Sequence, residues 1–555
     1  MTVKSRIVLC ALFGAATICS AQSTAPETTG TTIRSNARLV VVDVVAVDRQ
    51  GNPVQGLKAS DFTVSEDKKP QSIRGFDEHR STQVAQETPA LKLPPDTYTN
   101  YIPVQKKSGP VNILLFDMLN TEPAHLEFAK QQMIQFLRKL PPHQQFALFT
   151  LATELHMIQG FTEDSDSLIA AADELSILPS HVTKTIRQTA SDISETRIIK
   201  DPKARAAMIR YLLEEHGGHT DAQFSYTLEA LTQLARAVAV IPGRKNLIWI
   251  SDSLPANFLP GSVLGREYHT QIEHLGALFS TTQIAVFPVD AHGLMTSSAD
   301  ASISGSEIFR DTGGFADTQM SSLNSSYQTM ESIAAQTGGR VFRNSNDIAG
   351  AIRTSADLSS NYYTISYRPT NTRWNGDFRD ISIRTSKPGI HLQYRSGYYA
   401  IADPLSNGKE TQQALDSSIQ PFVPPSTSLL MKAKVVPPAS ENQSTSIDVL
   451  LDPHDLAFTN AGERKSLKLR FVIVAWDATG KNCGSIAGNF DPQFEKKGVD
   501  LIMKTGLQVH QFLSLKSGTY TLRIGVADRT SGVLGTLDVP LTVPATTATA
   551  RPTAK

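Results

Sequence analysis

Hydrophobic residues along this chain follow two different rhythms, which change near residue 110 and again near residue 360. In the outer regions, Val, Leu, Ile and Tyr alternate with polar residues, which is the period of a strand with one buried face. Between these regions, short apolar runs alternate with stretches of helical spacing. The pattern therefore predicts an α/β unit that lies between β segments.

The α/β unit is predicted over residues 109–358. Its first strand, "VNILLFD", ends at Asp117 and is apolar on both faces, as in a strand covered by helices on each side. The stretch "PAHLEFAKQQMIQFLRKL" has helical spacing and begins at Pro123, which suits a first helical turn. A later strand, "KNLIWISD", ends at Asp252. Strands that alternate with amphipathic helices predict a doubly wound, mostly parallel sheet.

Two polar stretches interrupt this alternation. Residues 180–224 are expected to form a partly helical insertion, with a loop at "EEHGGHT" and a new helix at "YTLEALTQLARAVAVI". Residues 296–325 are rich in Ser, Gly and Asp and are expected to form a loop.

The outer β segments divide into two predicted domains. Residues 36–80 and 361–402 are each too short to be stable alone, so we expect them to pair as one small β domain into which the α/β unit is inserted. Residues 428–545 contain strands at turn-bounded intervals, which predicts an immunoglobulin-like β-sandwich. The compositions of residues 81–109 and 404–427 predict linkers.

The N-terminus has the features of an export signal. Lys4 and Arg6 precede an apolar stretch that is too short to span a membrane, and Ala21 precedes the expected cleavage position. We therefore expect a signal peptide over residues 1–21 and a periplasmic or extracellular mature chain. Cys19 leaves lipidation as the alternative.

Composition narrows the partners of the mature chain. Cys483 would be its remaining cysteine, so no intrachain disulfide is expected, and no further segment is long and apolar enough for a transmembrane segment. The 53 basic and 53 acidic residues cancel, so net charge gives no reason to expect nucleic acid or an anionic membrane as partner.

Polar side chains gather where the central strands are predicted to end. Functional groups of a doubly wound sheet lie outside the carboxyl ends of its strands, which places Asp117 and Asp252 at one edge. Thr121 follows the first strand, and Thr227 lies at the predicted start of the helix "YTLEAL". Two carboxylates and two hydroxyls are oxygen ligands, which suit Mg²⁺ first and then Mn²⁺ or Ca²⁺.

These elements resemble the von Willebrand factor type A (VWA) domain. The segments "NILLFDMLNT", "FTLATELHMIQGFTEDSDSLIAAADEL", "GRKNLIWISDSLP" and "IAVFPVDAHGL" are similar to its successive elements, and the flanking β segments resemble those of exported bacterial VWA-containing proteins. The resemblance implies a metal-ion-dependent adhesion site with the pattern D-x-S-x-S, then Thr, then Asp. Asp117, Thr121, Thr227 and Asp252 match its ligands, and a partner protein's acidic side chain would complete the metal's coordination.

The chain departs from that pattern at one position. Leu119 stands in place of the first Ser, so one hydroxyl ligand is missing and the site is partly degenerate. Asn120 is an oxygen donor next to it, and Thr220 is the substitute for Thr227.

Other interpretations of the same residues stay open. Asp117 and Asp252 can each cap a helix or a turn. His216 and His219 have a spacing that suits a metal, and Asp290 ends a strand near the expected site. Gly338 and Gly339 are expected to end a helix rather than cradle a phosphate.

Three functions are compatible with these features. The first is an exported, non-enzymatic protein that mediates protein–protein interaction or adhesion through its metal site. The second is a metal-free scaffold that binds partners through its β domains. The third is a metal-dependent hydrolase, which is disfavoured because the chain lacks the G-x-S-x-G, H-E-x-x-H and G-x-x-x-x-G-K-[ST] motifs.

Overall fold

The computed structural model describes most of the chain between residues 39 and 545. The described residues are 39–80, 93–100, 111–140, 144–175, 192–193, 195–239, 241, 243–252, 269–293, 327–358, 360–401, 408–421, 423–439 and 443–545. The predicted signal peptide and the predicted loop over residues 296–325 lie outside them.

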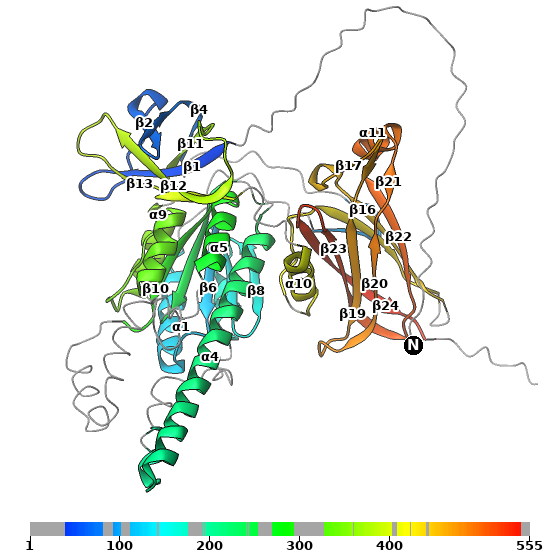
Figure 1. The fold of residues 1–555 in the computed structure, drawn as a ribbon, viewed down its shortest axis with the longest axis horizontal. Coiled ribbons are helices and arrows are strands. Elements are labelled where there is room, and N and C mark those ends of the chain that lie inside the picture. The colour runs from blue at the N-terminus through cyan, green and yellow to red at the C-terminus, as the bar shows by residue number, and fades with distance from the viewer. Residues whose placement is uncertain are drawn as a thin grey trace, which may run out of the picture.

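A five-stranded sheet forms the centre of the α/β unit (Figure 1). Its strands, in sheet order, are β10 (Ile284–Asp290), β9 (Lys245–Ser251), β6 (Val111–Asp117), β7 (Gln145–Leu151) and β8 (Leu155–Thr162). All neighbours are parallel except β7 and β8. Beyond β10, Phe342 adds a parallel bridge to Val289. The prediction of a mostly parallel sheet is confirmed.

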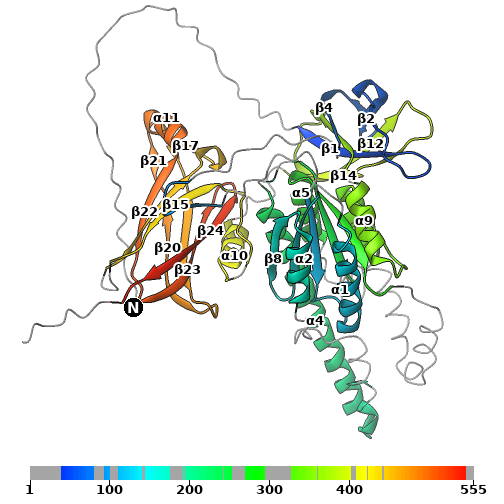
Figure 2. The same ribbon diagram turned by 180° about the vertical axis from the view of Figure 1, so that it is seen from behind.

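Helices cover both faces of this sheet because successive side chains of the central strands point to opposite sides. Ile113 and Leu115 of β6 pack with α4 (Pro202–Ala237) and α5 (His269–Thr281), which lie in front of the sheet in Figure 1. Leu114 and Phe116 face the other side, which is visible in Figure 2. That side is covered by α1 (Pro123–Leu137), α2 (Ser165–Asp173) and α9 (Ile348–Leu358).

The order of the strands places one edge of the sheet at a topological switch point. The chain passes from β6 outward through β7 and β8, and then returns to the other side of β6 with β9 and β10. Ligands of open α/β sheets bind where the winding direction reverses, outside the carboxyl ends of the strands. Here that edge lies beyond Asp117 and Ser251, and we call it the crevice edge.

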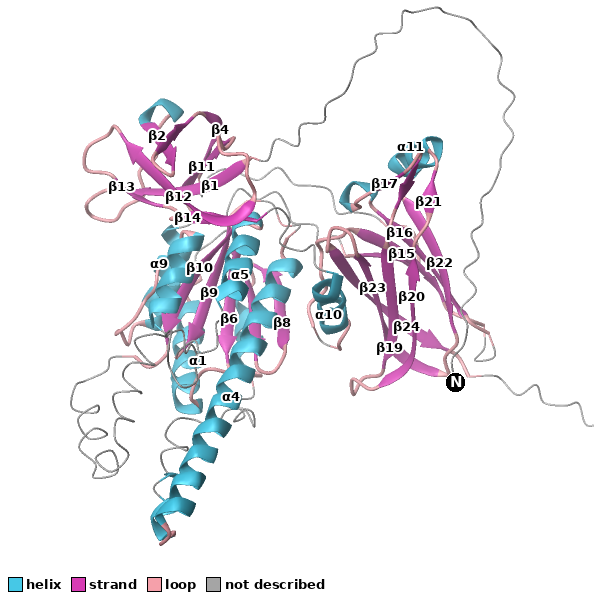
Figure 3. Ribbon diagram, in the orientation of Figure 1, coloured by secondary structure: helices cyan, strands magenta, loops and turns pink. Residues whose placement is uncertain are grey.

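Helix α4 is longer than the sequence predicts. The predicted loop at "EEHGGHT" is wrong, because Pro202–Ala237 form one continuous helix of 36 residues, about 54 Å long. Asp201 caps its start by accepting a hydrogen bond from Lys203 N at 2.9 Å. Its first half extends beyond the crevice edge (Figure 3). Thr227 therefore lies inside a helix and not at its start. A short 3₁₀ helix, η2 (Thr196–Ile198), precedes α4.

A small β domain consists of strands from both sides of the α/β unit. One sheet has the order β13-β1-β11-β4 and the other β14-β12-β2-β3, and the two sheets share one core. Residues before and after the α/β unit pair directly, as in Val42 with Ile365 and Val64 with Ile383. The elements are β1 (Val40–Val47), η1 (Ala59–Asp61), β2 (Phe62–Glu66), β3 (Lys69–Gln71), β4 (Ile73–His79), β11 (Tyr362–Tyr367), β12 (Asn375–Thr385), β13 (His391–Gln393) and β14 (Gly397–Ile401).

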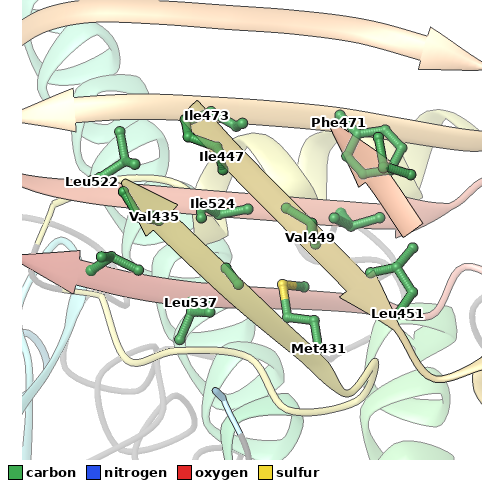
Figure 4. Close-up of a cluster of buried hydrophobic side chains, with 14 of the residues drawn as sticks. Met431, Val435, Ile447, Val449, Leu451, Phe471, Ile473, Leu522, Ile524 and Leu537 are labelled. Carbon is green, nitrogen blue, oxygen red and sulfur yellow. The ribbon is translucent and has the colours of Figure 1, made fainter. Parts of the chain in front are cut away.

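Two antiparallel sheets pack together in the C-terminal domain, in the orders β22-β16-β15-β5 and β20-β19-β23-β24, and a third, small sheet has the order β17-β18-β21. Figure 4 shows side chains of both sheets in their shared core, for example Val449 with Ile473 and Ile524. The immunoglobulin-like type of this sandwich stays a prediction. Its elements are β5 (Thr97–Thr99), β15 (Met431–Val436), β16 (Thr445–Leu451), η3 (Pro453–Asp455), β17 (Thr459–Ala461), β18 (Arg464–Ser466), β19 (Leu469–Trp476), β20 (Asn482–Phe490), β21 (Gln493–Phe494), α11 (Lys496–Thr505), β22 (Leu507–Leu513), β23 (Gly518–Asp528) and β24 (Leu534–Val543).

Both predicted linkers contain ordered elements of this domain. β5 pairs with β15, so residues 97–99 belong to the sandwich. α10 (Gly408–Ser418) packs Leu415 against β19 and β24, with Leu415 fully buried. The linker predictions are wrong for β5 and α10. They rested on polar composition, and a segment that is polar overall can still bury a few apolar residues on one face of a helix.

A glycine pair ends the helix over residues 327–337 and packs closely against β10. Gly338 has a φ of 77°, as expected for a helix end, and Gly339 N donates to Ala334 O at 2.8 Å. A Cβ atom on Gly339 would lie 1.7 Å from the carbonyl oxygen of Val286, which is buried in β10.

We expect Gly339→Ala to lower the free energy of unfolding of the α/β unit by about 3 kcal/mol, because a backbone carbonyl in a central strand has no room to move. The measurement is urea unfolding followed by Trp249 fluorescence in a Trp374→Phe/Trp476→Phe background, since each tryptophan lies in a different domain. Gly218→Ala is the control. It lies in α4 with nothing within 4 Å of its Cβ, so its stability should not fall. If Gly339→Ala is as stable as Gly218→Ala, the predicted clash with Val286 is wrong.

Candidate functional site at the crevice edge

Asp117 is the centre of a dense hydrogen-bond network at the end of β6. Its Oδ1 accepts from Leu119 N at 3.1 Å and from Asn120 N at 2.9 Å. Its Oδ2 accepts from Trp249 Nε1 at 3.0 Å and from Ser251 Oγ at 2.9 Å. The side chain is completely buried. Burial raises the pKa of the Asp117 carboxyl, and the hydrogen bonds from Asn120, Ser251 and Trp249 oppose that shift.

The side-chain amide of Asn120 links Asp117 to α4. Asn120 Nδ2 donates to Asp117 Oδ2 at 2.9 Å and to Thr227 Oγ1 at 2.8 Å. Thr227 in turn donates to Gln223 O at 2.8 Å, so its hydroxyl hydrogen is used and its oxygen accepts from Asn120. The amide nitrogen therefore occupies the place between a carboxylate and a hydroxyl that a cation would otherwise bridge. The sequence identifies Asn120 as an oxygen donor, but here its nitrogen makes the contacts.

Thr121 and Asp252 form a second pair at the same edge. Asp252 N donates to Thr121 Oγ1 at 3.1 Å. Asp252 Oδ2 accepts from Glu122 N at 2.9 Å, and Glu122 is the N-cap residue of α1. Asp252 thus caps the start of α1 from a neighbouring strand end, while Asp117 closes the turn that precedes this helix.

The four predicted metal ligands therefore meet at one edge, but as two pairs. Asp117 and Thr227 are joined through Asn120, whereas Thr121 and Asp252 are joined directly. Leu119, which replaces a hydroxyl of the adhesion-site pattern, is 1% exposed and belongs to the core under α4. An oxygen-only site for Mg²⁺, Mn²⁺ or Ca²⁺ does not fit this arrangement, because protein donors already fill both oxygens of Asp117.

Two histidines that the sequence reasoning missed lie beside Asp252. His125, in the first turn of α1, contacts Asp252 Oδ2 through Nδ1 at 2.8 Å. His292, two residues after β10, contacts Asp290 Oδ1 through Nδ1 at 2.9 Å and lies 3.5 Å from Asp252 Oδ1. The centroids of the two rings are 4.9 Å apart. In the sequence, their positions could have identified them, because His292 comes just after a predicted strand and His125 lies at the start of a predicted helix.

Carboxylates raise the pKa of both imidazoles. For His125 the hydrogen bond with Asp252 is the main cause, and it outweighs partial burial. For His292 burial acts in the opposite direction, but the hydrogen bond with Asp290 and the charge of Asp252 prevail and raise the pKa. Tyr327 also donates to Asp290 Oδ2 at 2.9 Å, which fixes that carboxylate.

The remaining candidates lie away from this group. His219 lies on α4, and the side chains of His216 and Thr220 lie outside the described residues. Among the described residues, His125, Asp252 and His292 form the group of His, Cys, Asp and Glu side chains that could hold a divalent metal ion.

Comparisons with known proteins give distant likenesses. No protein-family model and no curated protein matches the chain. An aerotolerance-related membrane protein from Bacteroides fragilis is 13% identical, with a TM-score of 0.24, over 45% of this chain and 98% of that one. The SpRpn10 VWA domain is 8% identical, with a TM-score of 0.20, over 45% of this chain and 97% of that one.

A further likeness is to proximal thread matrix protein 1 from the mussel byssus, a structure described as having a zinc-occupied MIDAS motif. It is 12% identical, with a TM-score of 0.24, over 47% of this chain, and the match spans 48% of the mussel protein. The sheet order, the antiparallel edge strand and the helices on both faces of the α/β unit agree with the doubly wound, VWA-like fold that the sequence predicts.

Proposed function

We propose that this chain is an exported, non-enzymatic protein whose VWA-like domain binds another protein at the crevice edge. The small β domain and the C-terminal sandwich would serve as spacers or additional contact surfaces. Export is proposed from the N-terminal sequence features. No helix in the described part of the chain is long and apolar enough to cross a membrane.

The main support is a row of buried carboxylates at the ends of three neighbouring strands. Asp117, Asp252 and Asp290 are each at most 4% exposed. Asp117 and Asp290 are the last residues of β6 and β10, and Asp252 directly follows β9. His125 and His292 lie half-buried over two of them. This arrangement places cationic or metal-binding imidazoles at the surface, which suits an acidic side chain of a partner protein.

The contacts of the imidazoles favour binding over catalysis. Among the hydrogen bonds of the described residues, His125 and His292 bond to carboxylates and to no serine, threonine or cysteine hydroxyl or thiol. Nucleophilic catalysis needs a base next to its nucleophile. Metal-dependent turnover of a substrate that is lost in Asp252→Ala would instead support a hydrolase.

A bulky charge at the rim of the crevice edge tests this proposal. Ala124 is exposed in the first turn of α1, next to His125, and makes no hydrogen bond through its side chain. We expect Ala124→Glu to weaken binding of a purified partner, first identified by cross-linking in the exported fraction, by at least about 10-fold, or about 1.4 kcal/mol, because its carboxylate repels the partner's acidic side chain. Biolayer interferometry would measure the affinity.

The matched control is Ala170→Glu on α2, where an exposed helical alanine also receives a charge. Its affinity should stay at the wild-type value. If Ala124→Glu also binds normally while deletion of residues 404–555 abolishes binding, the partner is held by the β domains and the scaffold alternative is correct.

A further inference from the structure

Three side chains from three different elements converge beside the crevice edge. His125 comes from α1, Asp252 follows β9 and His292 follows β10. One ligand atom from each lies within 4.8 Å of the other two. Because α1 packs against the strands that carry the other two residues, the fold itself sets this geometry.

Asp252 provides an independent sign that this group binds a cation. The residue is 4% exposed, and its Oδ1 is buried without a hydrogen-bond donor. Its Oδ2, by contrast, accepts from Glu122 N and His125 Nδ1. The nearest cationic group to Oδ1 is His292 Nδ1, at 3.5 Å. A buried carboxylate oxygen without a donor costs free energy, which a bound cation would offset.

We propose that His125, Asp252 and His292 bind a transition-metal ion of the zinc class. Two imidazoles and one carboxylate suit Zn²⁺, whereas Mg²⁺ and Ca²⁺ prefer oxygen ligands. The site is therefore displaced from the oxygen-only position, where the amide of Asn120 already bridges Asp117 and Thr227. Binding displaces the proton that His125 shares with Asp252.

Asp290 acts as a positioning residue. Its Oδ1 holds the ring of His292, and its Oδ2 is fixed by the hydroxyl of Tyr327. Carboxylates that orient metal-binding imidazoles in this way are common in zinc sites. Three protein ligands leave a fourth tetrahedral position open. That a partner's carboxylate fills this position rests on the proposed function, whereas zinc binding does not.

The test uses the full mature chain without an affinity tag, after removal of metals with a chelator. We expect isothermal titration calorimetry to show a single strong Zn²⁺ site and no heat from Mg²⁺ at the same concentration. Co²⁺ should give the visible absorption bands of a low-coordinate nitrogen and oxygen site. His125→Ala and His292→Ala should each weaken Zn²⁺ binding by at least about 100-fold. Circular dichroism would confirm that both variants fold.

The control is His454→Ala. His454 contacts Asp452 at 2.8 Å on the exposed surface of the sandwich, so it has the same pair chemistry without a second imidazole. Its Zn²⁺ affinity should equal that of the wild type. Absence of Zn²⁺ binding, or equal losses in all three variants, would overturn the site. Zinc binding that persists in Ala124→Glu while partner binding is lost would support both proposals. Absence of zinc binding in the wild type, with partner binding still weakened by Ala124→Glu, would remove the metal site alone.

Discussion

Replacement of Asn120 by aspartate is expected to make the stability of the α/β unit depend on a divalent cation. The change converts the amide that donates to Asp117 and Thr227 into a second carboxylate at the same distance. Like charges in a buried site repel, and the donor to Asp117 is lost as well. We expect the free energy of unfolding to fall by about 3 kcal/mol at pH 7.5 in the presence of a chelator.

Magnesium should reverse most of that loss. The two carboxylates and the hydroxyl of Thr227 would then form the oxygen-rich set that Mg²⁺ prefers. At 100 times the dissociation constant, binding to the folded state recovers about 2.7 kcal/mol. The measurement is urea unfolding followed by Trp249 fluorescence, at several Mg²⁺ concentrations, in the background with a single tryptophan.

Asn120→Ala separates the lost amide from the added charge. Asn120→Ala should be less stable than the wild type. Neither protein should gain stability when Mg²⁺ is added. If the wild type gains stability with Mg²⁺ as strongly as Asn120→Asp does, then the amide of Asn120 does not exclude the cation.

Removal of Glu66 is expected to unfold much of the small β domain. Glu66 and Arg379 form an ion pair at 3.4 Å with side chains that are 2% and 1% exposed. The hydroxyls of Tyr367 and Tyr398 donate to Glu66 Oε2 at 2.8 and 2.9 Å. Glu66→Ala leaves the guanidinium without its counter-charge and two buried hydroxyls without an acceptor. The expected loss is about 3–5 kcal/mol.

The fluorescence of Trp374 reports this loss, because its ring lies 5.3 Å from the guanidinium of Arg379. Lys387→Ala is the control in the same domain, since Lys387 pairs with Asp61 at 3.5 Å but is 55% exposed. Its effect should stay below about 1 kcal/mol. A Glu66→Leu/Arg379→Met variant should recover part of the stability. If the double variant is as unstable as Glu66→Ala, the loss of stability comes from altered packing and not from the unpaired charge of Arg379.

Apolar patterning was sufficient to predict the α/β unit. The run "NILLFD" is buried on both faces, and the alternation of strands and helices gave the parallel sheet. Asp117 and Asp252 follow strands that proved to be neighbours, so their shared edge could also be predicted. The continuity of α4 could not, because the glycines in "EEHGGHT" weaken a helix locally while packing farther along the chain sustains it.

The chemistry of the site was harder to predict than its place. The direction of the Asn120 amide depends on two acceptors, one of them more than one hundred residues away in sequence. His125 and His292 are isolated histidines in the sequence and become a group only when α1 and β10 come together. Spacing along the chain contains no information on such contacts.

Helix α4 contacts both the crevice edge and the C-terminal sandwich and so connects them mechanically. Thr227, in the second half of this helix, accepts from the Asn120 amide. About 14 Å farther along the axis, at the end of the helix, the carbonyl oxygens of Arg236 and Ala237 accept from Thr427, at the entry to the sandwich. A force applied to the sandwich is therefore transmitted through α4 to the Asn120 contacts at the crevice edge.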